Sequence, residues 1–383
     1  MTGPRVLVVV GADASTDTTR GPRRDYAVLA TMLGATIVDR RSIERSKIAR
    51  AIRAVAGTAP AFAWLAFRRL GDHDAVVTDG EHVGIPLALL MRLTRSKVHH
   101  VTIGHRLSAP KKQMFFRMLR CHDAMGTIVV HARRQYDHAV ASLGIPAEKL
   151  ALVPYHVDTE FWSPRATSDE RLVVSVGLEH RDYVTLFKAA SAVRASFVVA
   201  AASLWSRHAL RSKDAPPNVV IAELDYHQLR DLYARAAVVV VPLKDVDNQA
   251  GITTILEAMA MGKPVIVSQS RGQTDVIEDR RGPERGEPAP RPRSLLRLIA
   301  AEQDVPVEPN GFYVPPGDAD ALVRAIAFLL DHPEERASLG AAGRRLAERL
   351  LTVDAFAARL HALVVGGLRG ERETRAAKRV EFS

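Results

Sequence analysis

Asp247–Pro264 reads DNQAGITTILEAMAMGKP and carries the strongest structural signal in the chain. A polar turn ends at Gly251, and a short helix is predicted over Ile252–Met261. Gly262 ends this helix, and a buried strand is predicted over Pro264–Ser268. The unpaired backbone N–H groups and the dipole of such a helix N-terminus attract phosphate oxygens. The pattern therefore indicates a strand-and-helix unit that can bind an anion.

Glu257 adds a carboxylate to the predicted helix. N–H donors for phosphates and a carboxylate for ribose hydroxyls are what a nucleoside diphosphate requires. A helix capped at both ends within an α/β domain is the alternative interpretation. The residues alone do not separate the two.

Short apolar runs alternate with amphipathic segments over most of the 383 residues. The longer runs are rich in β-branched residues, as expected for parallel strands covered on both faces. Repeated strand–helix units predict an α/β fold with doubly wound parallel sheets. The predicted strands are Val6–Val10, Thr36–Asp39, Ala75–Thr78, Val98–Ile103, Ala124–Val130, Leu150–Val153, Leu172–Val176, Ser196–Ala200, Val219–Ala222, Val238–Val241 and Pro264–Ser268.

The segment Pro154–Arg171 has two prolines and no clear period, and a new strand follows it. It predicts a boundary between a first domain over 1–160 and a second over 161–352, with a terminal segment over 353–383. Two such halves place a ligand between them at the carboxyl ends of their strands. The Pro- and Arg-rich run Arg280–Arg293 indicates a loop, and the stretch of about 280–309 is expected to be an insertion.

Composition excludes several classes of protein. The single cysteine, Cys121, precludes an internal disulfide and favours a cytoplasmic location. No signal peptide and no run of about 20 apolar residues are recognisable. The net charge of +10 favours anionic partners, but no nucleic-acid-binding module and no metal-ligand spacing occur. We therefore expect no nucleic-acid partner and no metal.

The run Leu256–Val267, LEAMAMGKPVIV, resembles the signature of the retaining family 4 (group 1) glycosyltransferases. In that signature two glutamates flank a glycine turn. Glu257 matches the second glutamate, whereas Gln249 stands at the position of the first. The resemblance implies the GT-B fold: two Rossmann-like domains face each other across a cleft, and a C-terminal helix crosses back to the first domain. Val353–Val365 is the candidate for that helix.

The resemblance also implies the residues of a donor site. Ser175–Leu186, SVGLEHRDYVTL, resembles the family's glycine turn, after which Arg181 would contact the diphosphate. Thr102–Lys112, TIGHRLSAPKK, resembles the strand-end histidine segment, so His105 would contact the donor sugar. The implied catalytic residues are His105, Gln249 and Arg181. The implied donor-binding residues are Gly11, Arg181, Gln249, Ala250, Gly251, Ile252, Thr253 and Glu257.

Acceptor residues are expected in the first domain. Lys111 and Lys112 are candidates for contacting an acidic or phosphorylated acceptor. Glu81 follows a predicted strand within Thr78–His82 and is an exposed candidate, with helix capping as the alternative. Asn310–Asp318, NGFYVPPGD, resembles a family loop and is interpreted as turn chemistry.

The predicted function is transfer of a hexosyl-type sugar from a nucleoside diphosphate donor to an acceptor hydroxyl, with retention of configuration and without metal or cofactor. Neutral Gln249 leaves open a pseudo-glycosyltransferase that binds nucleotide without transfer. A nucleotide-sugar epimerase, a sugar phosphorylase and a basic interaction protein are further alternatives. The acceptor is a small molecule, a glycan or a lipid-linked sugar, and the oligomeric state is open.

Two segments raise the question of a peripheral contact at the inner face of the membrane. Trp64–Leu70 and Phe115–Arg120 both mix large apolar residues with basic ones. An ordinary half-buried helix is the preferred interpretation of each.

Overall fold

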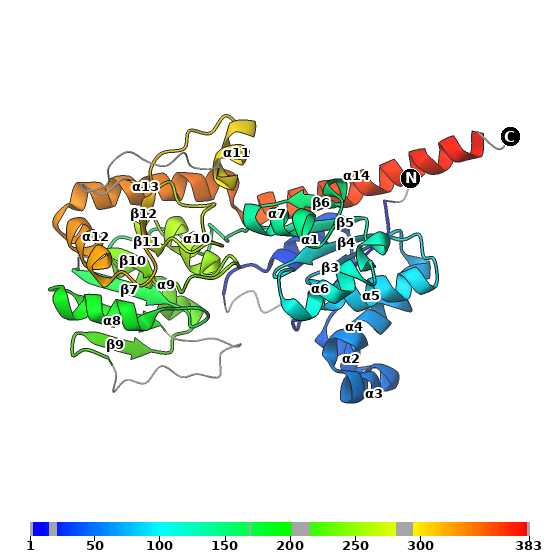
Figure 1. Ribbon diagram of the computed structural model, residues 1–383, viewed down its shortest axis with the longest axis horizontal. Helices are drawn as coiled ribbons and strands as arrows, with labels where there is room; N and C mark the ends of the chain where they lie inside the picture. Colours follow the sequence, from blue (N-terminus) through cyan, green and yellow to red (C-terminus); the bar gives the residue numbers. More distant parts are fainter. Residues whose placement is uncertain (1–2, 15–20, 168–169, 201–214, 281–293, 381–383) are drawn as a thin grey trace. The chain divides into compact units, whose positions relative to one another are not determined.

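The computed structural model describes residues 3–14, 21–167, 170–200, 215–280 and 294–380 of the chain (Figure 1). It divides into two compact units. The first contains the N-terminal strand, Arg23–Val153 and the C-terminal helix from Asp354; the second contains Pro154–Val353. Each unit has its own six-stranded sheet. The predicted α/β class with doubly wound parallel sheets is confirmed.

The first sheet has the strand order β2-β1-β3-β4-β5-β6, and every adjacent pair is parallel. The order reverses between β1 and β3, so the chain leaves these neighbouring strands toward opposite faces of the sheet. In doubly wound sheets this switch point is where ligands bind. The strands are β1 (Val6–Val9), β2 (Thr36–Val38), β3 (Ala75–Thr78), β4 (His99–Gly104), β5 (Thr127–Val130) and β6 (Leu150–Leu152).

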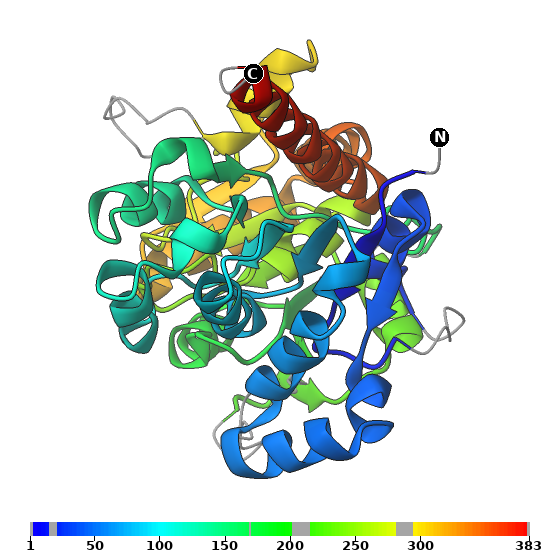
Figure 2. The same cartoon turned by 90° about the vertical axis from the view of Figure 1, so that its right-hand side faces the viewer.

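Helices cover both faces of the first sheet. α1 (Asp25–Leu33) and the C-terminal helix α14 (Val353–Val380) pack on one face through a shared apolar cluster. A second cluster joins the other face to α3, α4 and α5. Figure 2 shows α2, α3 and α4 in blue as a group of short helices. The remaining helices of this unit are α2 (Arg40–Glu44), α3 (Lys47–Ala56), α4 (Thr58–Phe67), α5 (Glu81–Leu93), α6 (Pro110–Arg117) and α7 (Arg133–Ala141).

The second sheet has the order β12-β11-β10-β7-β8-β9, again parallel throughout. Its switch point lies between β7 and β10. The strands are β7 (Leu172–Val176), β8 (Ser196–Ala200), β9 (Val219–Ala222), β10 (Val238–Val241), β11 (Val265–Ser268) and β12 (Gly311–Val314). The helices are α8 (Tyr183–Ala192), α9 (Tyr226–Arg235), α10 (Ile252–Ala260), α11 (Leu295–Glu302), α12 (Ala319–Asp331) and α13 (Pro333–Leu350).

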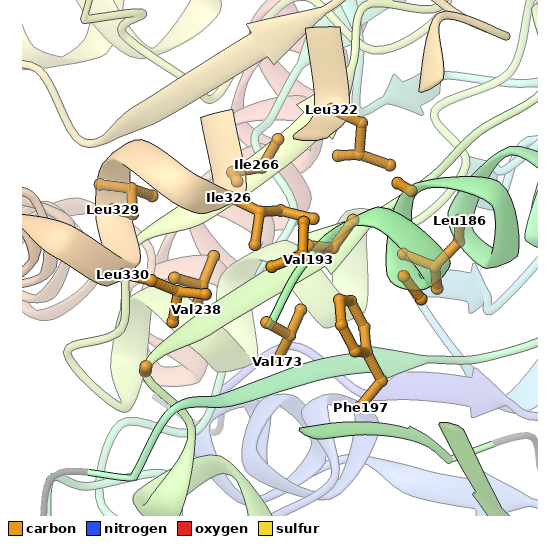
Figure 3. Close-up of a cluster of buried hydrophobic side chains, with 14 of the residues drawn as sticks. Val173, Leu186, Val193, Phe197, Val238, Ile266, Leu322, Ile326, Leu329 and Leu330 are labelled. Carbon is orange, nitrogen blue, oxygen red and sulfur yellow. The ribbon is translucent and has the colours of Figure 1, made fainter. Parts of the chain in front are cut away.

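One face of the second sheet is sealed by α8 and α12 (Figure 3). Val173, Phe197 and Val238 project from the strands toward Leu186 of α8 and Ile326 of α12. Burying large apolar side chains of this kind contributes about 1.5–3 kcal/mol each. This core fixes the strands whose carboxyl ends carry the candidate site.

The structure differs from the sequence-based expectation in three places. Gly311–Val314 is a buried strand rather than only a turn, because it pairs with β11 along its whole length. Residues 154–160 belong to the second unit, where the amide of Val157 donates to the carbonyl oxygen of Leu351 at 2.8 Å. The expected insertion contains α11 at its described end, and Arg280–Arg293 lies almost wholly outside the described residues.

Within the described residues, none of the helices is both long enough and apolar enough to cross a bilayer.

Candidate functional site

The N-terminus of α10 in the second unit is open. Gly251 precedes the helix with a left-handed φ of 78°, and no side chain caps the first turn. A Cβ atom at Gly251 would lie 2.7 Å from Cγ1 of Val241 and 3.4 Å from Nη1 of Arg181. Glycine is therefore required both by the backbone angle and by the close approach. The turn brings the first amides of α10 and the guanidinium of Arg181 to the same place.

Arg181 is held by three acceptors and is only 9% exposed. Its Nε donates to the carbonyl oxygen of Val176 (2.9 Å), Nη1 to that of Glu179 (3.0 Å), and Nη2 to Oγ1 of Thr254 (3.1 Å). Burial lowers the pKa of the guanidinium, which still remains charged because its ordinary pKa is so high. The result is a fixed positive charge.

A glycine also makes room for this guanidinium. A Cβ atom at Gly177, which has a φ of 92°, would lie 2.9 Å from Nη2 of Arg181. Gly177 follows β7 and Gly251 follows β10, and these two strands are neighbours at the switch point. The sheet topology therefore brings together two segments that are about seventy residues apart in the sequence.

Glu257 lies inside the same site and is 7% exposed. Its Oε2 accepts a hydrogen bond from the hydroxyl of Tyr233 at 2.9 Å. Burial raises the pKa of Glu257 to about 8, although the bond from Tyr233 and the charge of Arg181 act in the opposite direction. Burial also raises the pKa of Tyr233, with Glu257 as the next cause.

A second loop supports the turn before α10. The amide of Gly272 donates to the carbonyl oxygen of Val246 at 2.8 Å, and Nε2 of Gln273 donates to that of Ala250 at 3.1 Å. Gln273 is fully buried. Within the described chain, its Oε1 and that of Gln249 are buried without a hydrogen-bond partner. Gln249 therefore offers an unused acceptor beside the helix N-terminus.

The first unit places Glu81 in a buried position, so the expectation that it is exposed is wrong. Its carboxylate accepts the amides of His105 (2.9 Å) and Arg106 (3.0 Å) and forms an ion pair with Lys112. Burial opposes its charge, but Lys112 and the amide of His105 prevail and lower the pKa of Glu81. Glu81 lies in the first turn of α5, and its carboxylate accepts hydrogen bonds from the backbone amides of the loop after β4. Glu81 and Lys112, which were both expected to contact the acceptor substrate, are thus paired with each other.

His105 and Asp79 meet at the carboxyl ends of β3 and β4. Nε2 of His105 lies 2.8 Å from the carbonyl oxygen of Asp79. Burial and the nearby charge of Asp25 raise the pKa of Asp79 to about 7, against the charge of His105 and a hydrogen bond from the amide of Gly11. Asp25, Tyr26 and Asp79 line a small cavity whose remaining walls are apolar. Lys111 is exposed on α6.

The sequence-predicted residues thus form two groups. In the second unit the structure gathers Arg181, Gly251 and Glu257, with Ala250, Ile252, Thr253 and Gln249 in the adjoining turn. In the first unit it gathers Gly11, Glu81, His105 and Lys112. Sequence reasoning did not predict the side-chain contacts of Tyr233, Thr254 and Gln273, because the partner of each comes from another segment of the chain. The described part of the chain contains no group of three or more His, Cys, Asp or Glu side chains suited to a metal ion.

Residues 171–332 match the family model described as glycosyl transferases group 1. This segment covers β7 through α12 and includes Arg181, Gly251 and Glu257. None of the proteins with curated descriptions matches the sequence.

Several solved structures share this fold over nearly the whole chain. A glycosyltransferase from Rickettsia africae superposes with a TM-score of 0.68 at 13% identity, covering 96% of this chain and 99% of that one. Sucrose-phosphate synthase from Thermosynechococcus elongatus gives 0.64 at 16% identity, covering 97% and 100%. Anabaena Alr3699/HepE, solved in complex with UDP and glucose, gives 0.64 at 12% identity, covering 94% and 99%. At these identities the likeness establishes the GT-B fold.

The domain match and the fold agree with the geometry of the second unit, where an open helix N-terminus, a fixed guanidinium and a carboxylate converge. Residues 171–332 therefore match the group 1 glycosyltransferase model within a chain of GT-B fold, and this match supports a glycosyl-transferring enzyme of class EC 2.4.

Proposed function

We propose that this protein transfers a sugar from a nucleoside diphosphate donor to an acceptor hydroxyl, with retention of anomeric configuration and without a metal ion. The observation that carries the proposal is the pairing of Gly251 with Arg181. The position of a Gly251 Cβ lies 3.4 Å from Nη1 of the arginine, so the uncapped amides of α10 and a fixed positive charge adjoin. Both bind phosphate oxygens well.

Catalysis in this proposal depends on stabilising the leaving diphosphate. Negative charge grows on the phosphate oxygens as the glycosidic bond breaks, and preorganised N–H donors stabilise it without reorganisation. Ile252, Thr253 and Arg181 supply such donors. The acceptor then attacks from the face that the diphosphate leaves, assisted by the leaving phosphate, which gives retention without a protein nucleophile.

In this proposal Glu257 binds the ribose of the donor, and Gln249 binds the sugar that is transferred. The carboxylate of Glu257 binds ribose hydroxyls, and the amide of Gln249, whose Oε1 is without a partner in the described chain, binds the sugar. His105 is also proposed to contact a sugar hydroxyl. Because the Anabaena protein was solved with UDP and with UDP-glucose, a uridine diphosphate sugar is the first donor to test.

The acceptor binds to the first unit in this proposal. Exposed Lys111 contacts an acidic or phosphorylated acceptor, which is a small molecule, a glycan or a lipid-linked sugar. Lys112 is committed to Glu81, so Lys111 is the better candidate of the two. Replacing Lys111 by Ala should raise KM for such an acceptor and leave donor affinity unchanged.

A peripheral contact with anionic lipids at the cytoplasmic face of the membrane is also proposed. Leu93 and Met118 are 81% and 75% exposed, and Leu119 is 42% exposed. Nη1 of Arg92 donates to the carbonyl oxygen of Leu119, so the ends of α5 and α6 adjoin. Exposed arginines flank these residues at 92, 95, 117 and 120. Apolar side chains ringed by basic ones suit an anionic bilayer surface.

The lipid contact is tested by sedimentation with vesicles of phosphatidylcholine, with and without phosphatidylglycerol. We expect binding only with the anionic lipid, and weaker binding at high salt. Met118→Ser with Leu119→Ser should reduce it; equal binding by this variant would contradict the contact.

The donor proposal is tested by thermal shift with UDP, GDP, ADP and dTDP, followed by their sugars. Binding to the native state raises the melting temperature by mass action. Nucleoside diphosphate release that requires acceptor indicates transfer, and the anomeric NMR signals of the product report retention. Nucleotide binding without donor consumption would instead favour a pseudo-glycosyltransferase. Unchanged turnover after chelation with EDTA is expected.

A further inference from the structure

We infer that Tyr233 is the positioning residue for Glu257: its hydroxyl ties one carboxylate oxygen in place and directs the other to the ribose of the donor. This inference rests on the proposed function, because it assigns a role relative to a bound nucleotide. It concerns a side chain of α9, which lies outside the glycine turns and the α10 segment.

The first support is the geometry of the bond. The hydroxyl of Tyr233 donates to Oε2 of Glu257 at 2.9 Å, and both side chains are buried. Within the described chain Oε1 of Glu257 accepts no hydrogen bond. One carboxylate oxygen is therefore committed and the other is available to a ligand hydroxyl.

The second support is the rigidity of the tyrosine. Its ring meets the indole of Trp162 edge to face at 5.6 Å between centroids. Trp162 is 1% exposed and Tyr233 is fully buried. The next carbonyl, of Ala234, accepts from Nζ of Lys263 and from Oγ1 of Thr167 (2.9 Å). Contacts with Trp162, Lys263 and Thr167 therefore hold the end of α9 and restrict the movement of the tyrosine.

The third support is the link to the phosphate side of the site. Nη2 of Arg181 donates to Oγ1 of Thr254, which lies one helical turn before Glu257 on α10. Arg181 and Tyr233 therefore brace the same face of α10 at two successive turns. Side chains three or four residues apart on a helix lie on one face. Ribose and diphosphate contacts would in this way be set at a fixed spacing.

A comparison of ribonucleotides with deoxyribonucleotides tests the inference. Calorimetric Kd values are measured for UDP, GDP and ADP, each against its 2′-deoxy and 3′-deoxy counterparts. We expect the wild type to prefer the best-bound ribonucleotide by about tenfold over at least one deoxy analogue, as for the loss of one hydrogen bond to the Glu257 carboxyl group. Tyr233→Phe should reduce this preference to within about twofold, because Glu257 is no longer held toward the sugar.

A double-mutant cycle separates positioning from packing. If Tyr233 acts through Glu257, adding Tyr233→Phe to Glu257→Ala should change the ribonucleotide Kd by less than about twofold. A further large loss in the double variant would overturn the inference. Glu257→Asp provides a second route, since the shorter side chain cannot reach both tyrosine and ribose, and it should lose the same discrimination even if Tyr233→Phe folds poorly.

Tyr313→Phe is the matched control. Tyr313 is a buried tyrosine of β12 in the same unit, and it makes no hydrogen bond to Arg181, Thr254 or Glu257. Its replacement should leave ribose discrimination unchanged. If Tyr233→Phe keeps the wild-type preference for the ribonucleotide over its deoxy analogue, the positioning role is refuted but the proposed donor site is not. A wild type that binds none of the nucleotides, or binds deoxy and ribo forms equally, would instead contradict the proposed donor site.

Discussion

Glu81 and Lys112 form an ion pair in which the carboxylate, with 3% of its side chain exposed, also accepts the backbone amides of His105 and Arg106. A carboxylate with these partners is a structural element of the first unit. It holds the segment after β4 on which His105 is carried. The position of His105 therefore depends on Glu81, which the sequence analysis had predicted to contact the acceptor substrate.

Replacing Glu81 by Gln should destabilise the first unit by on the order of 3 kcal/mol, because it leaves the Lys112 ammonium without its buried partner. Chemical denaturation measures the change. Glu44→Gln, which breaks an exposed pair with Arg53, serves as the control and should cost less than about 1 kcal/mol. Equal effects of the two substitutions would contradict a structural role for Glu81.

Arg181→Lys should lower kcat/KM by about 100-fold, in the range seen when one preorganised donor to a developing anion is lost. An ammonium cannot reproduce the three directed bonds to Val176, Glu179 and Thr254, so the positive charge would no longer be fixed. Steady-state kinetics with the best donor measures the effect. Arg165→Lys, at an exposed pair with Asp231, should be silent. Normal turnover in Arg181→Lys would rule out the assigned role.

Gly251→Ala and Gly317→Ala form a matched pair because their φ angles are 78° and 79°. Both substitutions place a side chain in the left-handed region, at a cost of about 1 kcal/mol. A new Cβ at Gly317 meets no atom within 4 Å, whereas at Gly251 it meets Val241 at 2.7 Å. We expect both variants to fold, and only Gly251→Ala to lose nucleotide binding in calorimetry. Comparable losses in both would indicate a general effect of backbone strain.

The fold could be predicted from the sequence because the local composition of a segment identifies a buried parallel strand. Runs such as Val238–Val241 are apolar at every position, and their alternation with helices specifies a doubly wound sheet. β12 was missed because Gly311–Val314 is short and lies between turn residues. Its strand character comes from pairing with β11, which is not a local property.

The residues of the site could be predicted from the sequence only where they lie together in one segment. Gly251 and Glu257 follow from the α10 pattern, and Arg181 from the turn after β7. Tyr233 lies on the buried side of α9 and looks like any core aromatic residue until its hydroxyl is seen against Glu257. Glu81 was misjudged for the same reason, since its partners come from the segment after β4 and from α6, more than twenty residues away.

Glu257 should make the protein less stable as the pH rises. Its pKa is about 8 in the folded protein and 4.5 is its ordinary value, so between these values the folded state binds a proton that the unfolded state has released. Stability then falls with increasing pH, by at most about 1.4 kcal/mol per pH unit, and levels off above pH 8. Glu257→Gln should flatten this slope in denaturation curves. A parallel slope in the variant would show that Glu257 titrates normally.

Asp79 should act with the same sign over a lower window, from its ordinary pKa of 3.8 to about 7. Burial and Asp25 disfavour its charge, so folding retains the proton in this range and stability declines as the pH rises through it. An amide at this position stays neutral and can still accept the bond from the amide of Gly11. Asp79→Asn should therefore match the wild type below pH 4 and become relatively more stable toward pH 7, with no further change above pH 8. Melting temperatures at each half unit of pH test this, with Asp72→Asn at an exposed position as the control. A difference in melting temperature between wild type and Asp79→Asn that stays constant from pH 4 to pH 8 would contradict the raised pKa. Because Asp79 and Glu257 belong to different units, the double variant should show the sum of the two effects.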